Sequence, residues 1–175
     1  GLERLEDVSP DGKMVLFTGG ALATSVSSLR LDGPVDQRVP KPVLQTGEIV
    51  INTRFSPDGR WLLFEARSTA DPYSGEIYVQ PFPGPGRRRQ IAPRGQFPLW
   101  RKDGKEIVFL EQDRVWSINV TPAGNDLRFS APRNLFGVRP LAGVVADITP
   151  FAVSRDGSRF YIPQPVEQPD SGVIH

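Results

Sequence analysis

The fold is decided by the stretch Phe55-Ser56-Pro57-Asp58-Gly59-Arg60-Trp61-Leu62-Leu63-Phe64. An apolar residue leads into a polar turn, and a second apolar run starts directly after the turn. Proline presets φ at the first turn position, aspartate bonds to its own backbone, and glycine supplies the positive φ of a type I turn with a glycine bulge. The stretch therefore predicts a β-hairpin, with Asp58 forming the turn and having no metal-binding or catalytic role.

This hairpin pattern occurs four times along the chain. The Asp-Gly pairs lie 47, 45 and 53 residues apart, close to the roughly 40 to 50 residues of a four-stranded propeller blade. The other three copies are Val8-Ser9-Pro10-Asp11-Gly12-Lys13-Met14-Val15-Leu16-Phe17, Trp100-Arg101-Lys102-Asp103-Gly104-Lys105-Glu106-Ile107-Val108-Phe109 and Val153-Ser154-Arg155-Asp156-Gly157-Ser158-Arg159-Phe160-Tyr161-Ile162.

The sequence between the hairpins also predicts strands. Residues 75–80 and 113–120 alternate at period two and are predicted third strands, as residues 25–31 are in the first unit. The weaker fourth strands are placed at 41–45, 87–92 and 127–136, and no segment has a helical period. We therefore predict an all-β fold: a partial β-propeller of about four antiparallel four-stranded blades, with the last blade incomplete. The predicted blades are 1–46, 47–93, 94–138 and 139–175 of a single propeller fragment.

The second unit resembles a known family. Residues 55–64, followed by Gly75-Glu76-Ile77-Tyr78-Val79-Gln80-Pro81-Phe82-Pro83-Gly84-Pro85-Gly86, look like TolB-like, Trp-Asp-type bacterial propeller repeats. Residues 97–107 and 160–167 look especially like propellers found C-terminal to bacterial Ser/Thr protein kinases. The resemblance implies a binding or sensing module of a signalling protein, in an extracytoplasmic or periplasmic part of a membrane-anchored chain. It implies no kinase activity, because the glycine-rich loop, lysine and His-Arg-Asp elements are missing.

Composition argues against catalysis and against several kinds of site. The only histidine is His175, there is no cysteine and no Gly-x-Ser-x-Gly elbow, and no calcium-loop or P-loop pattern occurs. We therefore expect no enzyme activity, no catalytic residues, no metal and no cofactor. The net charge of +1 gives no reason to expect nucleic acid as a partner, and the apolar runs are too short for membrane insertion by this segment.

Loops that enter the first strand of a blade, or join its second strand to its third, converge on one face around a propeller axis. The loops at 67–74 and 93–97 should lie on this face, and they offer the predicted ligand- or partner-binding residues Arg67, Asp71, Tyr73, Arg94 and Gln96. The run Arg87-Arg88-Arg89 is read as a solvated outer strand, because no aromatic residues are interleaved with it. Trp61, Trp100 and Trp116 are assigned to the core between blades.

Three functions remain open at this stage. The first is a noncatalytic module that binds a protein or a small ligand, of unknown identity, for sensing. The second is the gating propeller of a prolyl-oligopeptidase-like peptidase whose catalytic domain lies elsewhere. The third is a structural module that closes a ring with another copy by self-association through its open blade edges, since about 45 residues per blade leave the chain too short for a six-bladed ring.

Overall fold

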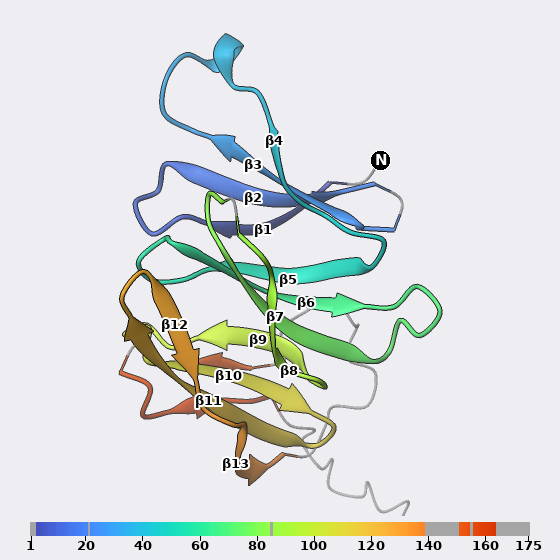
Figure 1. Ribbon diagram of the computed structural model, residues 1–175, viewed down its shortest axis with the longest axis vertical. Helices are drawn as coiled ribbons and strands as arrows, with labels where there is room; N and C mark the ends of the chain where they lie inside the picture. The colour runs from blue at the N-terminus through green and yellow to red at the C-terminus, as the bar shows by residue number, and fades with distance from the viewer. Residues whose placement is uncertain (1–2, 21, 85, 139–150, 155, 164–175) are drawn as a thin grey trace, which may run out of the picture.

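The computed structural model describes residues 3–20, 22–84, 86–138, 151–154 and 156–163, and these residues form antiparallel sheets stacked one after another (Figure 1). The first sheet contains β1 (Arg4–Val8), β2 (Met14–Gly19), β3 (Ser25–Arg30) and β4 (Lys41–Gln45), hydrogen-bonded in that order. A single 3-10 turn, η1 (Val35–Gln37), lies in the loop between β3 and β4.

The second sheet has the same simple order of neighbouring strands. It contains β5 (Ile49–Phe55), β6 (Trp61–Arg67), β7 (Gly75–Pro81) and β8 (Arg89–Ala92). The third sheet contains β9 (Gln96–Trp100), β10 (Glu106–Glu111), β11 (Arg114–Ala123), β12 (Asp126–Phe129) and β13 (Arg133–Gly137). Strands β14 (Ala152–Val153) and β15 (Phe160–Tyr161) form the described part of a fourth sheet. The predicted all-β partial propeller is confirmed.

The outermost strand of the third sheet differs from the single strand predicted at 127–136. It is divided into β12 and β13, which pair with successive stretches of the same long strand β11. Ser130 occupies the break, where its amide donates to the Asn119 carbonyl at 3.0 Å and its hydroxyl accepts the Asn119 amide at 2.9 Å. Pro132 precedes β13 and has no amide hydrogen for a ladder, which explains why regular pairing stops there. Residues 171–175, where the incomplete last blade is expected to have its third strand, lie outside the described residues.

The repeated hairpin turn has the geometry that its residues predict. In the second sheet, the Ser56 hydroxyl donates to Asp58 Oδ1 at 2.5 Å, and the same carboxylate oxygen accepts the Arg60 amide at 3.1 Å. Gly59 has φ of +70°, and the glycines at the other three Asp-Gly turns have φ of +71° or +72°. A side chain there would have to adopt the left-handed region, which only glycine enters at no steric cost. Each turn is therefore specified locally.

One consequence of this turn can be measured by titration. Asp156 accepts hydrogen bonds from the Ser154 hydroxyl at 2.6 Å and from the amide and hydroxyl of Ser158, which lower the pKa of Asp156 to about 2. Since the folded pKa lies below the unfolded value, the stabilisation by this carboxylate is present above the unfolded pKa and is lost as pH falls through about 2. We expect carboxyl-carbon NMR to show Asp156 ionised at pH 3, and a midpoint near 4 would contradict the turn geometry.

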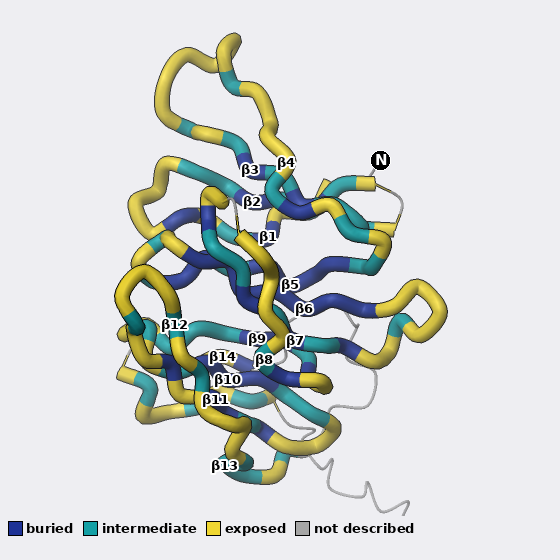
Figure 2. Tube along the Cα trace, in the orientation of Figure 1, coloured by how far each residue is buried: buried dark blue, intermediate teal, exposed yellow. Residues whose placement is uncertain are grey.

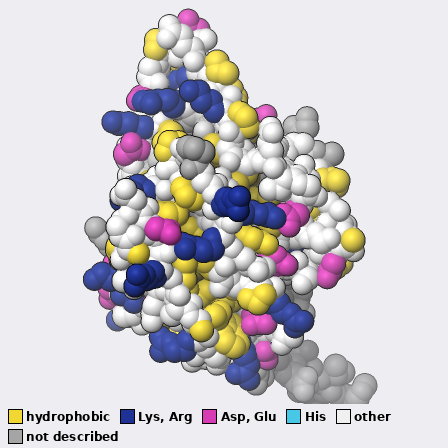
Figure 3. All heavy atoms as spheres, viewed as in Figure 1, with side chains coloured by type: hydrophobic (Ala, Val, Ile, Leu, Met, Phe, Trp, Pro, Cys, Tyr) yellow, Lys and Arg dark blue, Asp and Glu magenta, His cyan; other side chains and the backbone are white. Residues whose placement is uncertain are grey.

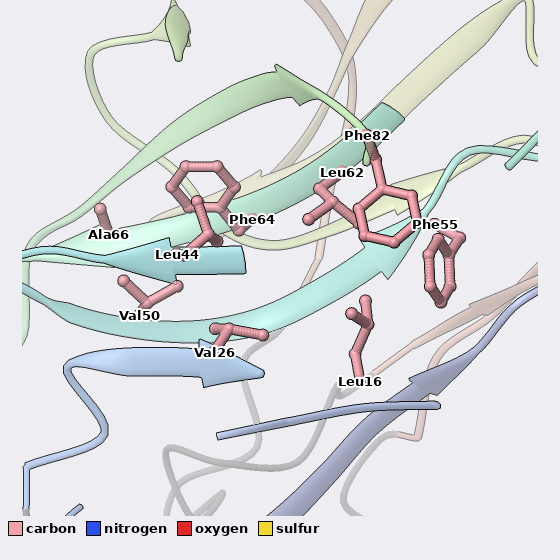
Figure 4. Close-up of a cluster of buried hydrophobic side chains, with 9 residues drawn as sticks. All are labelled: Leu16, Val26, Leu44, Val50, Phe55, Leu62, Phe64, Ala66 and Phe82. Carbon is pink, nitrogen blue, oxygen red and sulfur yellow. The ribbon is translucent and has the colours of Figure 1, made fainter. Parts of the chain in front are cut away.

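The core lies between the sheets, and alternate residues of each second strand face opposite neighbours. Leu62 and Phe64 pack towards the first sheet, whereas Trp61 and Leu63 pack towards the third. Figure 4 shows the first of these layers, in which Leu16 and Val26 of the first sheet meet side chains of β5 and β6. Figure 2 shows that the buried residues concentrate along the middle of the stack.

The three tryptophans all belong to the layer between the second and third sheets. Trp61 is buried in it, and Trp100 and Trp116 are half-buried and pack against it. The assignment of these residues to the core between blades is confirmed, and Trp100 additionally lines a surface groove.

Candidate functional site

A groove of about 640 Å³ lies where the innermost strands of all four sheets end. The strands β1, β5, β9 and β14 each contribute their last residues, and the turns that follow them complete the wall. The volume is within the roughly 300 to 1,000 Å³ of typical ligand sites. The lining residues are Asp7, Val8, Pro10, Arg54, Phe55, Ser56, Pro57, Leu99, Trp100, Arg101, Lys102, Phe151, Ala152, Val153 and Ser154.

The groove combines an apolar lining with positive charge. Its aliphatic and aromatic residues come from every sheet, and Val8 is 45% exposed there. Of its cations, Arg101 is engaged by Asp103 at 2.7 Å and by Glu106 at 3.0 Å. Lys102 is exposed and has no ion pair among the described side chains. The groove therefore offers apolar contact together with an available ammonium group.

Two hydrogen-bond donors in the groove have no acceptor among the described residues. The Nε1 of Trp100 and the Nε of Arg54 are both buried and unpartnered. Arg54 is otherwise held in place, because its Nη1 donates to the Glu6 carbonyl at 2.9 Å and lies 4.0 Å from Asp7 Oδ1. A buried donor without a partner costs about 1 to 3 kcal/mol. Both atoms have almost no accessible surface, so they lie beneath the wall of the groove and not on it.

Asp7 is the acidic member of the groove. Burial raises the pKa of Asp7, against the opposing effects of the Phe55 and Val8 amides and of the Arg54 charge. The Phe55 amide donates to Asp7 Oδ2 at 2.9 Å, so this carboxylate bridges the first and second sheets. Burial therefore disfavours the ionised form of Asp7 relative to an exposed carboxyl, while the nearby Arg54 charge favours it.

Buried carboxylates join neighbouring sheets in the same way along the inner strands. Glu6 Oε2 accepts the Thr53 amide at 2.9 Å, and Glu65 Oε2 accepts the Phe97 amide at 3.0 Å. Glu65 is fully buried, and it also accepts from Asn52 Nδ2 at 2.9 Å. In each case an acid of one sheet caps an amide on the innermost strand of the next sheet, which is an edge strand with no neighbour on one side.

The local backbone explains why these amides are available. Asn52 has φ of +54° and Phe97 has φ of +55°, and the pairing register shifts at both places. Such bulges turn a backbone amide out of its ladder. Sequence reasoning missed this network, although Glu65 gave a signal: it is a lone acid within an otherwise apolar strand.

Arg67 differs most from its predicted setting among the five predicted binding residues. Its side chain is buried at 6% exposure, its Nε donates to Glu65 Oε1 at 2.5 Å, and its Nη1 donates to the Pro72 carbonyl at 3.0 Å. These contacts are internal, so the observed role of Arg67 is to neutralise Glu65 and hold the loop that follows β6.

The other four predicted residues lie on the two loops as expected, and the loops touch. Gln96 Nε2 donates to the Tyr73 carbonyl at 2.8 Å, and the Gly95 amide donates to the Gly75 carbonyl at 2.8 Å. Tyr73 is 81% exposed, and Asp71 and Arg94 are also exposed. These loops stand at the beginning of the inner strands, whereas the groove stands at their end. A binding role for these residues stays a prediction.

The three arginines of the run are exposed, and two of them pair with acids on the surface. Arg88 pairs with Glu48 and lies over the Tyr78 ring at 4.5 Å, while Arg89 pairs with Asp126 at 3.0 Å and lies over Phe129 at 4.7 Å. Arg89 thereby joins the second sheet to the third. The interpretation of the run as an outer strand is confirmed for Arg89, the first residue of β8, whereas Arg87 and Arg88 precede the strand.

The described residues contain no group of three or more His, Cys, Asp or Glu placed to hold a metal ion. No described helix is long and apolar enough to cross a membrane. Figure 3 shows basic and acidic side chains interspersed over the face of the molecule that is viewed in Figure 1.

Comparison with solved structures identifies the type of fold. A protein from Agrobacterium tumefaciens provisionally named TolB superposes with a TM-score of 0.53 at 19% identity, over 78% of this chain and 51% of its own. The chain has a TolB-like β-propeller fold. A protein from Bacteroides uniformis provisionally named a 6-phosphogluconolactonase gives 0.55 at 17% identity, over 90% of this chain and 46% of its own. A functionally unknown protein from Desulfotomaculum acetoxidans superposes with a TM-score of 0.55 at 14% identity, over 93% of this chain and 66% of its own.

No protein-family model and no curated protein matches the sequence. The chain spans about half the length of the TolB-like and lactonase-named structures, so what it shares with them is a run of blades. At these identities the likeness shows the fold alone.

Proposed function

We propose that this chain is a noncatalytic protein-binding propeller whose groove takes an extended peptide segment of a partner. The observation that carries the proposal is the combination of an apolar lining with the exposed ammonium of Lys102, which has no ion pair among the described side chains. A segment with apolar side chains and a carboxylate matches both features, because its side chains contact the lining and its carboxylate pairs with the ammonium.

The hydrogen bonds and ion pairs of the polar groups in the groove support a binding role over a catalytic one. Ionisable groups in the groove are Asp7, Arg54, Arg101 and Lys102, and three of these are bonded or paired to neighbours that fix them in place. Nucleophilic catalysis needs a base within hydrogen-bond reach of a nucleophile. The two groove serines, Ser56 and Ser154, instead donate to the turn aspartates Asp58 and Asp156 and accept backbone amides.

Peptide selection tests the proposal. A library of displayed linear peptides is selected on the wild-type chain, and the affinity of each enriched peptide is then measured for variants. We expect enriched peptides to contain Asp or Glu beside apolar residues. Lys102→Glu should weaken binding about tenfold or more through charge reversal.

The matched control is Arg94→Glu on the opposite loops, which also reverses one exposed charge. The affinity of this variant for the peptides should stay within about twofold of the wild-type affinity, because exposed charges away from a contact contribute little to binding. If Arg94→Glu weakens binding and Lys102→Glu does not, the site is the loop face with Asp71, Tyr73 and Gln96. Thermal unfolding of each variant shows whether a loss of binding reflects a loss of folding.

A noncatalytic role is tested separately, because one structural neighbour is named after a lactonase. We expect no acceleration of 6-phosphogluconolactone hydrolysis by the chain over buffer. A rate that scales with protein concentration and survives Asp7→Asn and Lys102→Glu would place chemistry outside the groove, and a rate abolished by either would contradict the binding role.

The cellular role that we propose is sensing by a larger bacterial signalling protein, in its extracytoplasmic part. Support comes from the resemblance of residues 97–107 and 160–167 to kinase-linked propellers. A gating role in a prolyl-oligopeptidase-like peptidase makes a different prediction for the parent gene. An encoded kinase domain and a single membrane span upstream would support sensing, whereas an α/β-hydrolase domain downstream would overturn it.

A further inference from the structure

A second pocket, separate from the groove, lies under the loop that joins β3 to β4. Its volume is about 710 Å³, and none of its lining residues also lines the groove. The β3–β4 loop forms one wall, and Gly59, Phe82 and Pro83 of the second sheet form the other. Figure 1 shows this loop, with η1, projecting beyond the stack of sheets. We call this space the loop pocket.

The apolar part of the lining is continuous with the core between the first and second sheets. Met14 and Val43 are half-buried and pack against the core cluster to which Phe82 belongs. The ring of Phe82 is fixed edge-on against Phe55, with 5.2 Å between the ring centroids. On the opposite wall, Val39 is 68% exposed. An apolar group placed between these walls would remove exposed apolar surface from water.

The charged part of the lining is basic. It contains Arg30, Arg38 and Lys41, and Asp32 is the one acid among the described lining residues. Arg30 donates to both carboxylate oxygens of Asp32, at 2.9 and 2.6 Å, so this acid is already paired. Lys41 is exposed, and neither Lys41 nor Arg38 has an ion pair among the described side chains. Figure 3 shows basic side chains gathered beneath the projecting loop.

The loop is held in shape by its own hydrogen bonds. Arg38 Nη2 donates to the Gly33 carbonyl at 3.1 Å, across the base of the loop. The amides of Gln37 and Arg38 donate to the carbonyls of Pro34 and Val35, each at 3.2 Å. The guanidinium of Arg38 is therefore positioned before any ligand arrives, which lowers the entropy cost of binding.

We propose that the loop pocket binds a small molecule that has one carboxylate and an apolar body. The body packs on Met14, Val43 and Phe82, and the carboxylate pairs with the cations of the loop. A small molecule is the occupant because the volume lies within the roughly 300 to 1,000 Å³ of small-ligand sites, and the pocket has two facing walls. The negative charge complements Arg38 and Lys41, the two cations that have no counter-charge. This site is additional to the groove proposed for a peptide.

Met14 makes ligand binding in the loop pocket directly observable. It is the only methionine of the chain, so isotopic labelling of methionine methyl groups gives one NMR resonance, from the pocket itself. We expect 2-naphthoate to shift this resonance saturably, because its rings would lie against the methyl group. The amide 2-naphthamide has nearly the same shape without the charge, and it should bind about 2- to 10-fold more weakly. Acetate has the carboxylate without the rings, and it should leave the resonance unchanged at the same concentrations.

Substitutions at exposed positions test each wall without disturbing the core. Lys41→Glu should weaken 2-naphthoate binding about fivefold or more by charge reversal, and Val39→Asp should do the same by charging the apolar wall. Val35→Asp is the matched control for the loop, since Val35 is 75% exposed on the same loop but does not line the pocket. Lys102→Glu reverses an exposed charge in the groove instead. Both controls should stay within about twofold of the wild-type affinity.

Three results would overturn the proposal. The first is a Met14 resonance that does not move up to the solubility limit of 2-naphthoate. The second is equal affinity for 2-naphthoate and 2-naphthamide, which would show apolar contact without recognition of charge. The third is weakening by Lys102→Glu but not by Lys41→Glu, which would place the acid in the groove. Peptide binding in the groove is measured with other ligands and other variants, so the failure of one proposal leaves the other standing.

Discussion

Replacing Glu65 by alanine should destabilise the chain by about 3 to 5 kcal/mol, the cost of removing one partner of a buried ion pair. Glu65 is fully buried, and its carboxylate accepts from Arg67 Nε, Asn52 Nδ2 and the Phe97 amide. Without it, the guanidinium of Arg67 stays buried at 6% exposure without its counter-charge. Urea unfolding followed by tryptophan fluorescence measures the free energy, since Trp61 and Trp100 lie at the affected interface between sheets.

The control is Glu3→Ala, because Glu3 is an exposed acid outside the network. It should change the free energy of unfolding by less than about 0.5 kcal/mol. Glu65→Gln keeps the shape and one acceptor oxygen, but it removes the charge and replaces the other acceptor with an NH2 donor. Its cost should therefore lie between that of Glu65→Ala and that of Glu3→Ala. Equal stability of Glu65→Ala and Glu3→Ala would show that the carboxylate does not join the second and third sheets.

The repeated hairpins could be predicted because all their determinants are local. Ser56, Asp58 and Gly59 lie within four residues of one another, and their hydrogen bonds do not depend on the rest of the fold. The strands next to the turns follow from the same signal, and β7 begins where period-two alternation places it. Sequence reasoning succeeded for the turns because their hydrogen bonds join residues close together in the chain.

The carboxylate network could not be predicted because its members come from separate sheets. Phe97 lies 32 residues from Glu65, and Thr53 lies 47 residues from Glu6. Their amides become donors only where a bulge turns them out of the ladder, and Phe97 at φ of +55° shows no sequence sign of this. Arg67 was predicted to face a ligand because it ends a strand at a loop, but its partner Glu65 lies two residues earlier and draws it inward.

The groove was missed for a related reason. Its walls are the ends of inner strands from four sheets, and a repeat gives the order of the sheets but not the depth of the space between them. The loops with Tyr73 and Gln96 were predicted from their place in the blade, and they do meet, at the opposite end of the same strands. Polar composition marks exposed loops, whereas a groove lined by Leu99, Phe151 and Val153 resembles core in the sequence.

Gly75→Ala is expected to have the second large effect on stability. An added Cβ would lie 2.4 Å from Glu65 Oε1 and 2.5 Å from the Gly95 carbonyl oxygen, so either the carboxylate or the β8–β9 loop must move. Overpacking costs about 1 to 3 kcal/mol, and weakening a hydrogen bond to a charged group adds about 1.5 to 3. We expect a total of about 2 to 4 kcal/mol in urea unfolding, because some of the two costs overlap.

Gly47→Ala is the matched control, because a Cβ there meets no atom within 4 Å and its φ is not in the left-handed region. It should be neutral or stabilising by up to about 1 kcal/mol, through the reduced freedom of the unfolded chain. If the loss at Gly75 comes from the displaced carboxylate, then Gly75→Ala should cost much less in a Glu65→Ala background, where that oxygen is gone. Additive losses in the double variant would show that the Gly95 carbonyl, and not the carboxylate, requires glycine at position 75.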